Sequence, residues 1–228
     1  MTVLHLADEG EAADLAAFLS RLLHYDRSAA VRLQAAGTAL AVFGRPPSFE
    51  VLAVRAVRLA KPYENGLDVT LDVTVSAGEL LETVDEQAAT AAVPGAVTGP
   101  PWAGVLPPRG GWRPEPGLPA PDALRALVAA AVAEFRSRTA ELTPEERTRA
   151  ELDRIGREIW SRTVGDTGLP VRAVHAAQSL GFLRASASAS GGDAPGLFSS
   201  GAWLRLRTPY GSVALRRAGT GALGISVR

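Results

Sequence analysis

With 228 residues, 46% of them hydrophobic and 21% charged, the chain has the composition of a globular protein that can bury a substantial core. It contains no cysteine, which excludes disulfides, cysteine-ligated zinc and thiol catalysis. Because this composition fits a reducing compartment, we expect a cytoplasmic protein. The charges of the 24 basic and 24 acidic side chains cancel, which argues against a protein that coats nucleic acid and against a polybasic membrane anchor. The longest apolar run, Leu127–Ala133, is too short to span a bilayer.

Residues 1–93 are expected to form an acidic α+β unit in which a helix packs on a mostly antiparallel sheet. The helix is predicted over 11–25, where apolar side chains recur at helical spacing and acidic residues gather at the positive end of the helix dipole. The alternation of the stretch 50–59 changes near Arg55, which indicates either a bulge or a strand that is buried on both faces. A short helix is expected over 78–87. Strands are expected at 3–6, 29–34, 38–44, 50–59 and 67–76.

The clearest local signal is the stretch 67–76, where apolar and polar residues alternate without interruption. Strict alternation is typical of a half-buried strand with one solvated face, and Asn65-Gly66 before it is a strong two-residue hairpin turn. The solvated face is a candidate acidic interaction surface for a cation or a basic peptide, and an ordinary solvated sheet face is the alternative. Its members are Asp68, Thr70, Asp72 and Thr74.

Residues 94–121 differ from the rest of the chain, because nine of these 28 residues are proline and six are glycine. They also contain Trp102 and Trp112, which a purely flexible linker would not need. We therefore expect an ordered connector that is pinned to the rest of the protein by largely buried indoles. A docking ligand for a partner protein is the alternative interpretation of its Pro-Pro-Trp and Pro-Pro-Arg-Gly-Gly-Trp segments.

Residues 122–228 are expected to form a helical unit that ends in a basic β-hairpin. The first helix is predicted over 122–141, and the second begins at Thr143, which combines an N-cap with a first-turn proline and a capping-box glutamate. The third helix is short and ends at a C-cap glycine, Gly181. Further expected elements are the third helix over 170–181, a loop over 186–201, a hairpin over 202–217 and an edge strand over 222–227.

Three helices followed by a strand and a hairpin have the chain order of a winged helix, so a winged-helix-like fold is one candidate for the C-terminal unit. Four polar side chains of the third helix, at positions 172, 175, 178 and 179, then share a face, which suits base edges in a major groove. One face of the hairpin interleaves a tryptophan with arginines, which suits a nucleic-acid backbone or an acidic protein. The candidate basic surface consists of Arg172, His175, Gln178, Trp203, Arg205, Arg207 and Arg216.

Two observations favour an ordinary solvated surface instead. Arginine outnumbers lysine by 23 to one, which is typical of codon bias in a GC-rich genome. An arginine-lined hairpin also protects the edge of a sheet from aggregation. We therefore weigh where the arginines lie rather than how many there are.

The neutral total hides a charge difference between the two halves. Residues 1–100 carry 7 basic and 13 acidic side chains, whereas residues 101–228 carry 17 basic and 11 acidic ones. Because opposite charges steer and align contacts, the halves are predicted to touch, within one chain or across a dimer. A faint resemblance also links 11–44 with 170–217, since each contains a helix followed by strands, but the identity is too low to indicate a duplication.

The sequence favours a non-catalytic interaction protein, an adaptor or regulator that binds another protein or a second copy of itself. A winged-helix-like nucleic-acid-binding protein is the alternative. An enzyme without a recognisable motif is a third hypothesis, because active sites can assemble from residues distant in sequence. No spacing around His5, His24 or His175 indicates a catalytic or metal site, so no cofactor, metal or membrane partner is expected.

Overall fold

A computed structural model describes residues 2–60, 71–184 and 194–217 of the chain. The elements in chain order are β1 (Val3–His5), α1 (Glu9–Tyr25), β2 (Ala30–Ala36), β3 (Ala39–Gly44), the 3-10 helix η1 (Pro47–Phe49), β4 (Leu52–Arg58), β5 (Asp72–Ser76), α2 (Ala77–Glu82), β6 (Val84–Asp85), β7 (Thr90–Ala92), the 3-10 helix η2 (Pro101–Gly104), β8 (Arg113–Glu115), α3 (Pro121–Ala140), α4 (Arg149–Trp160), α5 (Val171–Ser179), β9 (Gly196–Ser200), β10 (Trp203–Thr208) and β11 (Gly211–Arg216). The predicted α+β class and the C-terminal hairpin β10–β11 are confirmed.

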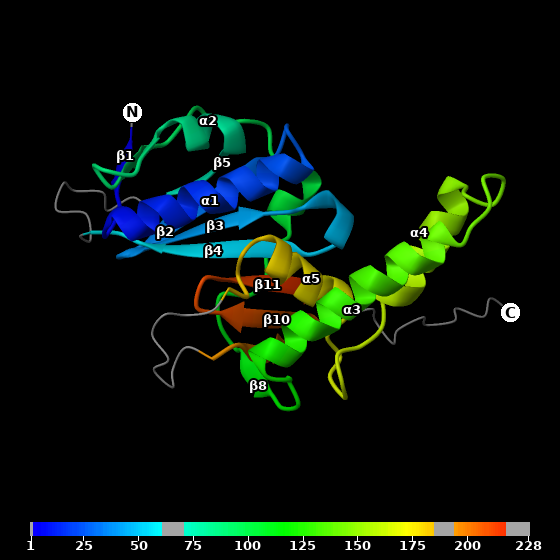
Figure 1. The fold of residues 1–228 in the computed structure, drawn as a ribbon. Coiled ribbons are helices and arrows are strands. Elements are labelled where there is room, and N and C mark those ends of the chain that lie inside the picture. The colour runs from blue at the N-terminus through cyan, green and yellow to red at the C-terminus, as the bar shows by residue number, and fades with distance from the viewer. Residues whose placement is uncertain (1, 61–70, 185–193, 218–228) are drawn as a thin grey trace, which may run out of the picture.

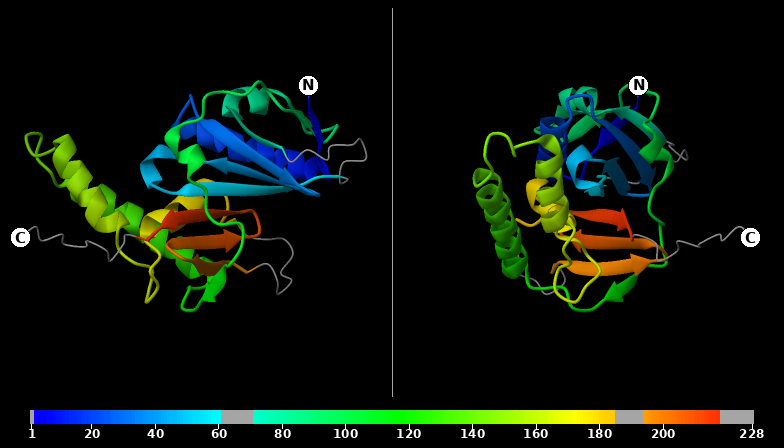
Figure 2. Two further views of the ribbon diagram at one scale, coloured as in Figure 1. Left: turned by 180° about the vertical axis from the view of Figure 1, so that it is seen from behind. Right: turned by 90° about the vertical axis from the view of Figure 1, so that its right-hand side faces the viewer.

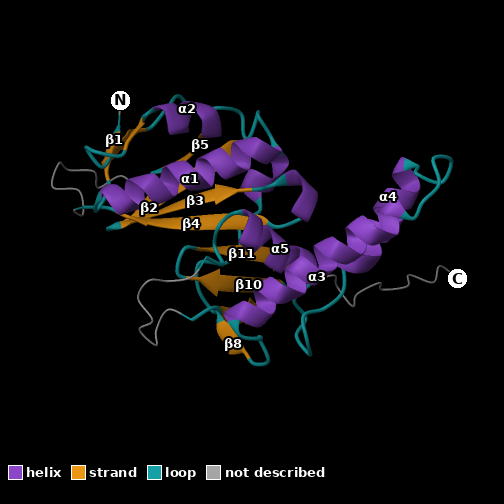
Figure 3. Cartoon of the chain, in the orientation of Figure 1, coloured by secondary structure: helices purple, strands orange, loops and turns teal. Residues whose placement is uncertain are grey.

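One eight-stranded antiparallel sheet organises the molecule, with α1, α3 and α5 on one of its faces (Figures 1 and 3). Its strand order is β5-β2-β3-β4-β11-β10-β9-β8, while β1, β7 and β6 form a separate small sheet. Each half of the sheet has one outer strand followed by a three-stranded meander that ends at the centre. The outer strand and meander are β5 and β2–β3–β4 in one half, and β8 and β9–β10–β11 in the other. Across the described ranges, no helix combines the length and the apolar character that crossing a membrane requires.

The N-terminal half packs α1 on the meander β2–β3–β4. Asp8 caps the helix by accepting a hydrogen bond from the Glu11 backbone N–H at 2.9 Å, and the helix buries one continuous apolar stripe. Strand β4 stays in register with β3 throughout, and residues 52–55 are all buried. The change of alternation near Arg55 therefore reflects burial on both faces of a central strand, and not a bulge. The buried stripe of α1 consists of Ala12, Leu15, Phe18, Leu19 and Leu22.

The C-terminal half packs α5 against β11, and α3 covers α5. As predicted, the chain leaves α5 at Gly181, which has a φ of +77° and lets the Phe182 N–H donate to the Ala177 carbonyl at 2.7 Å. A Cβ atom at this position would also lie 2.8 Å from the guanidinium carbon of Arg21. The positive φ is what favours glycine here, because the Arg21 guanidinium is the end of a flexible side chain that can move aside.

Helix α4 begins later than the sequence predicts. The capping box does form, because the Glu146 carboxylate accepts from the Thr143 N–H at 3.0 Å and the Thr143 hydroxyl accepts from the Glu146 N–H at 3.3 Å. It closes a single turn, however, and the helix starts after Thr148, whose hydroxyl accepts from the Glu151 N–H at 3.2 Å. The predicted start at Thr143 is therefore wrong, since a second capping threonine lies a few residues further along.

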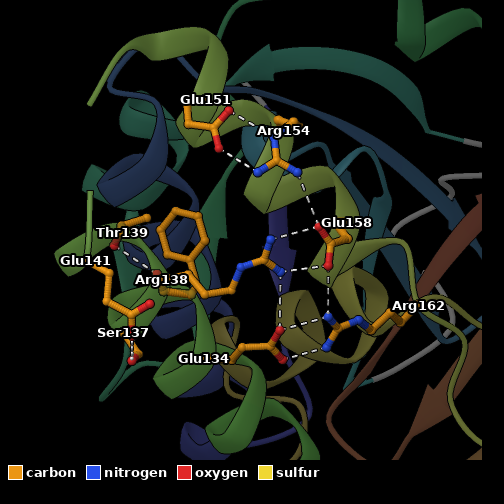
Figure 4. A network of polar contacts seen from close by, with 10 residues as sticks. Glu134, Ser137, Arg138, Thr139, Glu141, Glu151, Arg154, Glu158 and Arg162 are labelled. Carbon is orange, nitrogen blue, oxygen red and sulfur yellow. Dashed lines mark hydrogen bonds and ion pairs between the residues drawn. The ribbon is translucent and has the colours of Figure 1, made fainter. Parts of the chain in front are cut away.

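Helices α3 and α4 form a hairpin that projects from the body (Figure 2) and is joined along its surface by ion pairs (Figure 4). Arg138 donates to the two carboxylate oxygens of Glu158 at 2.7 and 2.8 Å, and Arg162 donates to those of Glu134 at 2.5 and 2.8 Å. The hydrogen bond from Arg138 lowers the pKa of Glu158 to about 2. The network aligns the two helices at a solvated surface, where such pairs contribute little to stability individually.

The two oppositely charged halves touch, as predicted, and they do so within one chain. Strand β4 pairs with β11, with Val54 opposite Ser212. On the helix side, the rings of Phe18 and Phe182 stack at 5.7 Å, and Arg184 donates to the Asp14 carboxylate at 2.5 Å. The contact is thus mainly a shared sheet and a shared core, supplemented by side-chain contacts such as this ion pair.

A winged-helix arrangement is not what the structure contains. In a winged helix the hairpin lies free at the edge of a small sheet, whereas β10–β11 occupies the interior of the eight-stranded sheet, between β4 and β9. Helix α5 is also covered, by the sheet on one side and by α3 and η1 on others. The pairing of β4 with β11 excludes a free wing and decides the arrangement.

The connector is ordered and docked, as predicted. It runs along the edge of β5, where the Val97 N–H donates to the Thr74 carbonyl at 2.9 Å, and then crosses the sheet on the face opposite the helices (Figure 2). Trp102 packs on a second apolar cluster, and the Trp112 indole donates to the Pro108 carbonyl at 2.9 Å. Both indoles are half-buried rather than largely buried. The second cluster consists of Phe43, Leu52 and Val54, with Ala41, Trp102, Leu106 and Trp203 packed against it.

Candidate functional site

Strand β10 presents its side chains alternately to the two faces of the sheet. Leu204 and Leu206 belong to the main core under the helices, so Trp203 and its alternate neighbours point to the opposite face. Cross-strand pairing places further side chains on that face, because directly paired residues share a face. The resulting surface, which we call the arginine face, consists of Arg205, Arg207, Arg216, Trp112, Phe198 and Trp203.

Each arginine of the arginine face lies over an aromatic ring. The electron-rich face of a ring attracts a guanidinium group and favours a fixed position for an otherwise flexible side chain. The distances from guanidinium carbon to ring centroid are 5.6 Å for Arg205 over Trp112, 5.2 Å for Arg207 over Phe198 and 5.8 Å for Arg216 over Trp203. The surface therefore carries three cations, each with an aromatic ring beneath it that favours its position.

Among the described residues, no carboxylate neutralises these cations. None of the three forms an ion pair with a carboxylate in the described part of the chain, and the Arg205 Nε donates instead to the Ser212 hydroxyl at 2.9 Å. Burial, followed by the adjacent charge of Arg207, lowers the pKa of Arg205 below its usual value. Arg207 and Arg216 are exposed. As far as the described residues extend, the arginine face therefore offers positive charge without acidic partners, and hydrogen-bond donors, to a negatively charged group.

The candidate acidic face is largely satisfied from within the protein. Asp72 accepts hydrogen bonds from Arg32 at 2.7 and 2.9 Å and from Gln34 at 3.1 Å, and the bonds from Arg32 hold the pKa of Asp72 below its usual value. Gly99 of the connector approaches the Thr74 side chain closely. Asp68 and Thr70 lie outside the described residues. In the described part, the carboxylate of this face is thus paired on the sheet itself.

The remaining candidates lie on the other side of the sheet, because α5 packs on the face that Leu204 and Leu206 occupy. Arg172 lies 3.5 Å from a Glu50 carboxylate oxygen. The His175 imidazole stacks on Trp160 with centroids 4.6 Å apart, and burial lowers its pKa. Gln178 is exposed. The structure thus separates the expected basic surface into two sets that cannot contact one partner group together.

Sequence reasoning missed the aromatic supports of the arginine face. Phe198 lies in a stretch that we expected to be a loop, yet residues 196–200 form strand β9. The adjacent apolar residues Leu197 and Phe198 were the available signal, weakened by the serines and glycines around them. Trp112 was recognised as an anchor, but its contact with Arg205 depends on the path of the connector. Within the described ranges, no group of three or more His, Asp or Glu side chains could hold a metal ion.

Comparisons with known proteins find two family models and similar solved structures. A family model described as a domain of unknown function (DUF8185) matches residues 107–220, half of the chain, and one described as a domain of unknown function (DUF8010) matches residues 1–104. No curated protein matches the sequence. Among solved structures, a DNA polymerase sliding clamp from Pseudomonas aeruginosa, determined with a ligand, is similar over 90% of this chain at 13% identity and a TM-score of 0.46; the chain spans 62% of that clamp chain.

Proposed function

For this chain, which belongs to the DUF8185 family, we propose a function as an interaction protein that binds an acidic segment of another protein through the arginine face. One observation carries the proposal: three guanidinium groups lie over aromatic rings on one face of a rigid sheet, without a carboxylate partner in the described part of the chain. Arginine and aromatic residues are the side chains that dominate binding energy at protein interfaces.

The spacing of the arginines suits an extended acidic segment. Arg205 and Arg207 are alternate residues of one strand, so their Cα atoms lie about 7 Å apart. Alternate side chains of an extended partner segment recur at the same interval and can place successive carboxylates against successive guanidinium groups. A guanidinium group can donate two parallel N–H hydrogen bonds to one carboxylate, a geometry that a lysine cannot provide.

The arginines that cover the aromatic rings favour a protein partner over a nucleic acid. Proteins that bind single strands leave ring faces open, so that bases can stack on them. On the arginine face, each of the three rings has an arginine over it. The cations remain able to bind phosphates, which keeps single-stranded nucleic acid as the second candidate, but no open stacking platform supports it.

The test is a fluorescence anisotropy titration with a labelled twelve-residue peptide of alternating glutamate and serine at low salt. The variant carries Arg205→Gln, Arg207→Gln and Arg216→Gln. Each exposed charge pair is worth about 0.5–1 kcal/mol, so its affinity should fall about tenfold to a hundredfold. The control variant carries Arg27→Gln, Arg136→Gln and Arg147→Gln, which removes the same charge from exposed positions elsewhere.

Equal losses in the two variants would show that only total charge matters and would refute the arginine face as the binding surface. A mixed-sequence single-stranded oligonucleotide of equal charge serves as the competitor. Binding of this oligonucleotide at least tenfold tighter than the peptide, and lost in the first variant, would establish the nucleic-acid alternative instead.

A further inference from the structure

A groove of about 910 Å³ lies on the helix side of the molecule, between η1 with its following residue on one wall and α4 on the other. It is separate from the arginine face, which lies on the opposite side of the sheet. Such a volume is in the range of small-molecule sites, which are mostly apolar with a few convergent polar groups. Its lining includes Phe135, Gly156, Arg157, Trp160 and Arg172, with Glu50 on the η1 wall.

The floor of the groove contains a glycine inside a helix. Glycine is unfavourable in a helix interior compared with alanine, so its presence at position 156 needs a reason. A Cβ atom there would lie 3.5 Å from the Trp160 ring and 3.7 Å from the Phe135 ring, which is ordinary van der Waals contact and not a clash. Packing within the protein therefore does not require the glycine. Its effect is to leave the edges of two aromatic rings open to the groove.

Hydrogen-bond donors without acceptors surround this aromatic floor. The Trp160 indole N–H, 3.7 Å from that Cβ position, has no acceptor among the described residues. The Arg172 Nε is buried without a hydrogen bond in the same part of the chain, and a Glu50 carboxylate oxygen at 3.5 Å is too far to satisfy it. Arg157 is exposed and forms no ion pair with a described carboxylate. A buried donor without a partner is unfavourable, so the Arg172 guanidinium favours an acceptor from outside, and Arg157 and the Trp160 indole N–H are further donors available to the same acceptor.

The charge of the groove agrees with an anionic ligand. Three arginines, at 149, 157 and 172, face two carboxylates, Glu50 and Asp153, and Asp153 is already paired with Arg149 at 3.2 Å. A carboxylate is a group that only accepts hydrogen bonds, and it would satisfy donors and neutralise the excess charge at once.

We infer that this groove is a binding site for a small aromatic carboxylate. The ring lies on the floor that Gly156 leaves open between Phe135 and Trp160, and the carboxylate accepts from the donors at Arg157, Arg172 and Trp160. The inference does not rest on the arginine face, since the two surfaces share no residue.

The experiment follows the tryptophan indole N–H signals of the ¹⁵N-labelled full chain by NMR while 2-naphthaleneacetate is added. The four tryptophans are assigned by single Trp→Phe substitutions. We expect a saturable shift of the Trp160 signal with a Kd of about 1 mM, the value for a ligand of about 14 non-hydrogen atoms and ordinary efficiency. The signals of Trp112 and Trp203 on the arginine face should not follow the same curve.

Matched ligands separate the two parts of the proposed chemistry. The neutral analogue 2-naphthaleneethanol should bind at least tenfold more weakly, and acetate alone should produce no saturable shift at about 10 mM. Equal binding of the neutral analogue would overturn the role of the carboxylate. Absence of any saturable Trp160 shift with about 10 mM 2-naphthaleneacetate would overturn the site.

Two variants distinguish a binding role from a structural one. Gly156→Ala should raise the melting temperature or leave it unchanged, because alanine favours the helix, while the added methyl group weakens ligand binding at least fivefold. Arg172→Gln should weaken binding about tenfold, and Arg136→Gln on the exposed surface of α3 should not. If Gly156→Ala lowers stability, or if it binds the ligand as tightly as the natural chain, the glycine has another role and the inference fails.

Discussion

Replacing Arg55 with methionine tests whether a buried ion cluster fastens the two halves of the chain together. The Arg55 side chain is only 7% exposed and lies on β4 beneath α1. One guanidinium nitrogen is 2.9 Å from a Glu11 oxygen and 3.2 Å from an Asp14 oxygen, and another donates to the Tyr210 carbonyl at 2.7 Å. Arg55 thus joins the first helix to the turn of the C-terminal hairpin.

The size of the effect follows from what remains when Arg55 is removed. Breaking a buried ion pair by deleting one partner costs about 3–5 kcal/mol, because the other charge stays buried. Here each carboxylate keeps a second arginine: Arg58 lies 2.9 Å from Glu11, and Arg184 lies 2.5 Å from Asp14. We therefore expect a loss of about 2–3 kcal/mol in the free energy of unfolding. For a chain of this length, that loss lowers the melting temperature by about 5–10 °C.

The measurement is thermal and urea unfolding of the Arg55→Met variant followed by circular dichroism. Arg149→Met is the matched control, because the Arg149–Asp153 pair is exposed and should contribute less than about 0.5 kcal/mol. If Arg55→Met unfolds within about 0.5 kcal/mol of the natural chain, the cluster does not hold the halves together. The junction would then depend on the β4–β11 ladder and the apolar core alone.

Three further predictions concern titration, salt and the connector. Burial lowers the pKa of His175, so as the pH falls below about 6.5 the unfolded chain takes up a proton before the folded chain does. The free energy of unfolding should therefore fall more steeply with decreasing pH in the natural chain than in His175→Phe. Equal losses in the two proteins between pH 7.5 and 5, measured by urea unfolding, would contradict this. The pKa of Glu158 is lowered to about 2, so the contribution of its carboxylate to stability is present above about pH 4.3 and is lost as the pH falls toward 2. Glu158→Gln should lower the melting temperature slightly in low salt and not in about 1 M NaCl, which screens the ion pairs. A decrease that persists in high salt would show that the network acts by packing. Trp102→Ala removes the indole that covers the second apolar cluster, so limited proteolysis should cleave the connector faster. Val105→Ala, at an exposed position of the connector, is the control. Unchanged cleavage of Trp102→Ala would mean that the connector is held by its backbone contacts alone.

The sequence by itself determined most of the helices, the C-terminal hairpin and the α+β class. The helices of the two halves appear close to their predicted positions because each carries its own apolar periodicity, as α1 does over Glu9–Tyr25 and α3 over Pro121–Ala140. The hairpin turn between Thr208 and Gly211 and the C-cap at Gly181 also follow from local turn chemistry. Features of this kind depend on residues a few positions apart, which a sequence displays directly.

Tertiary structure alone decided which surfaces exist. The pairing of Val54 with Ser212 joins strands from opposite ends of the chain, and neither strand's sequence specifies its partner. That pairing converts a possible wing into an interior hairpin and puts Arg205 and Arg172 on opposite faces of one sheet. The rings that support the arginines, and the open floor at Gly156, likewise depend on contacts between distant segments. Long-range pairing is governed by the burial of the whole core, so a local pattern cannot reveal it.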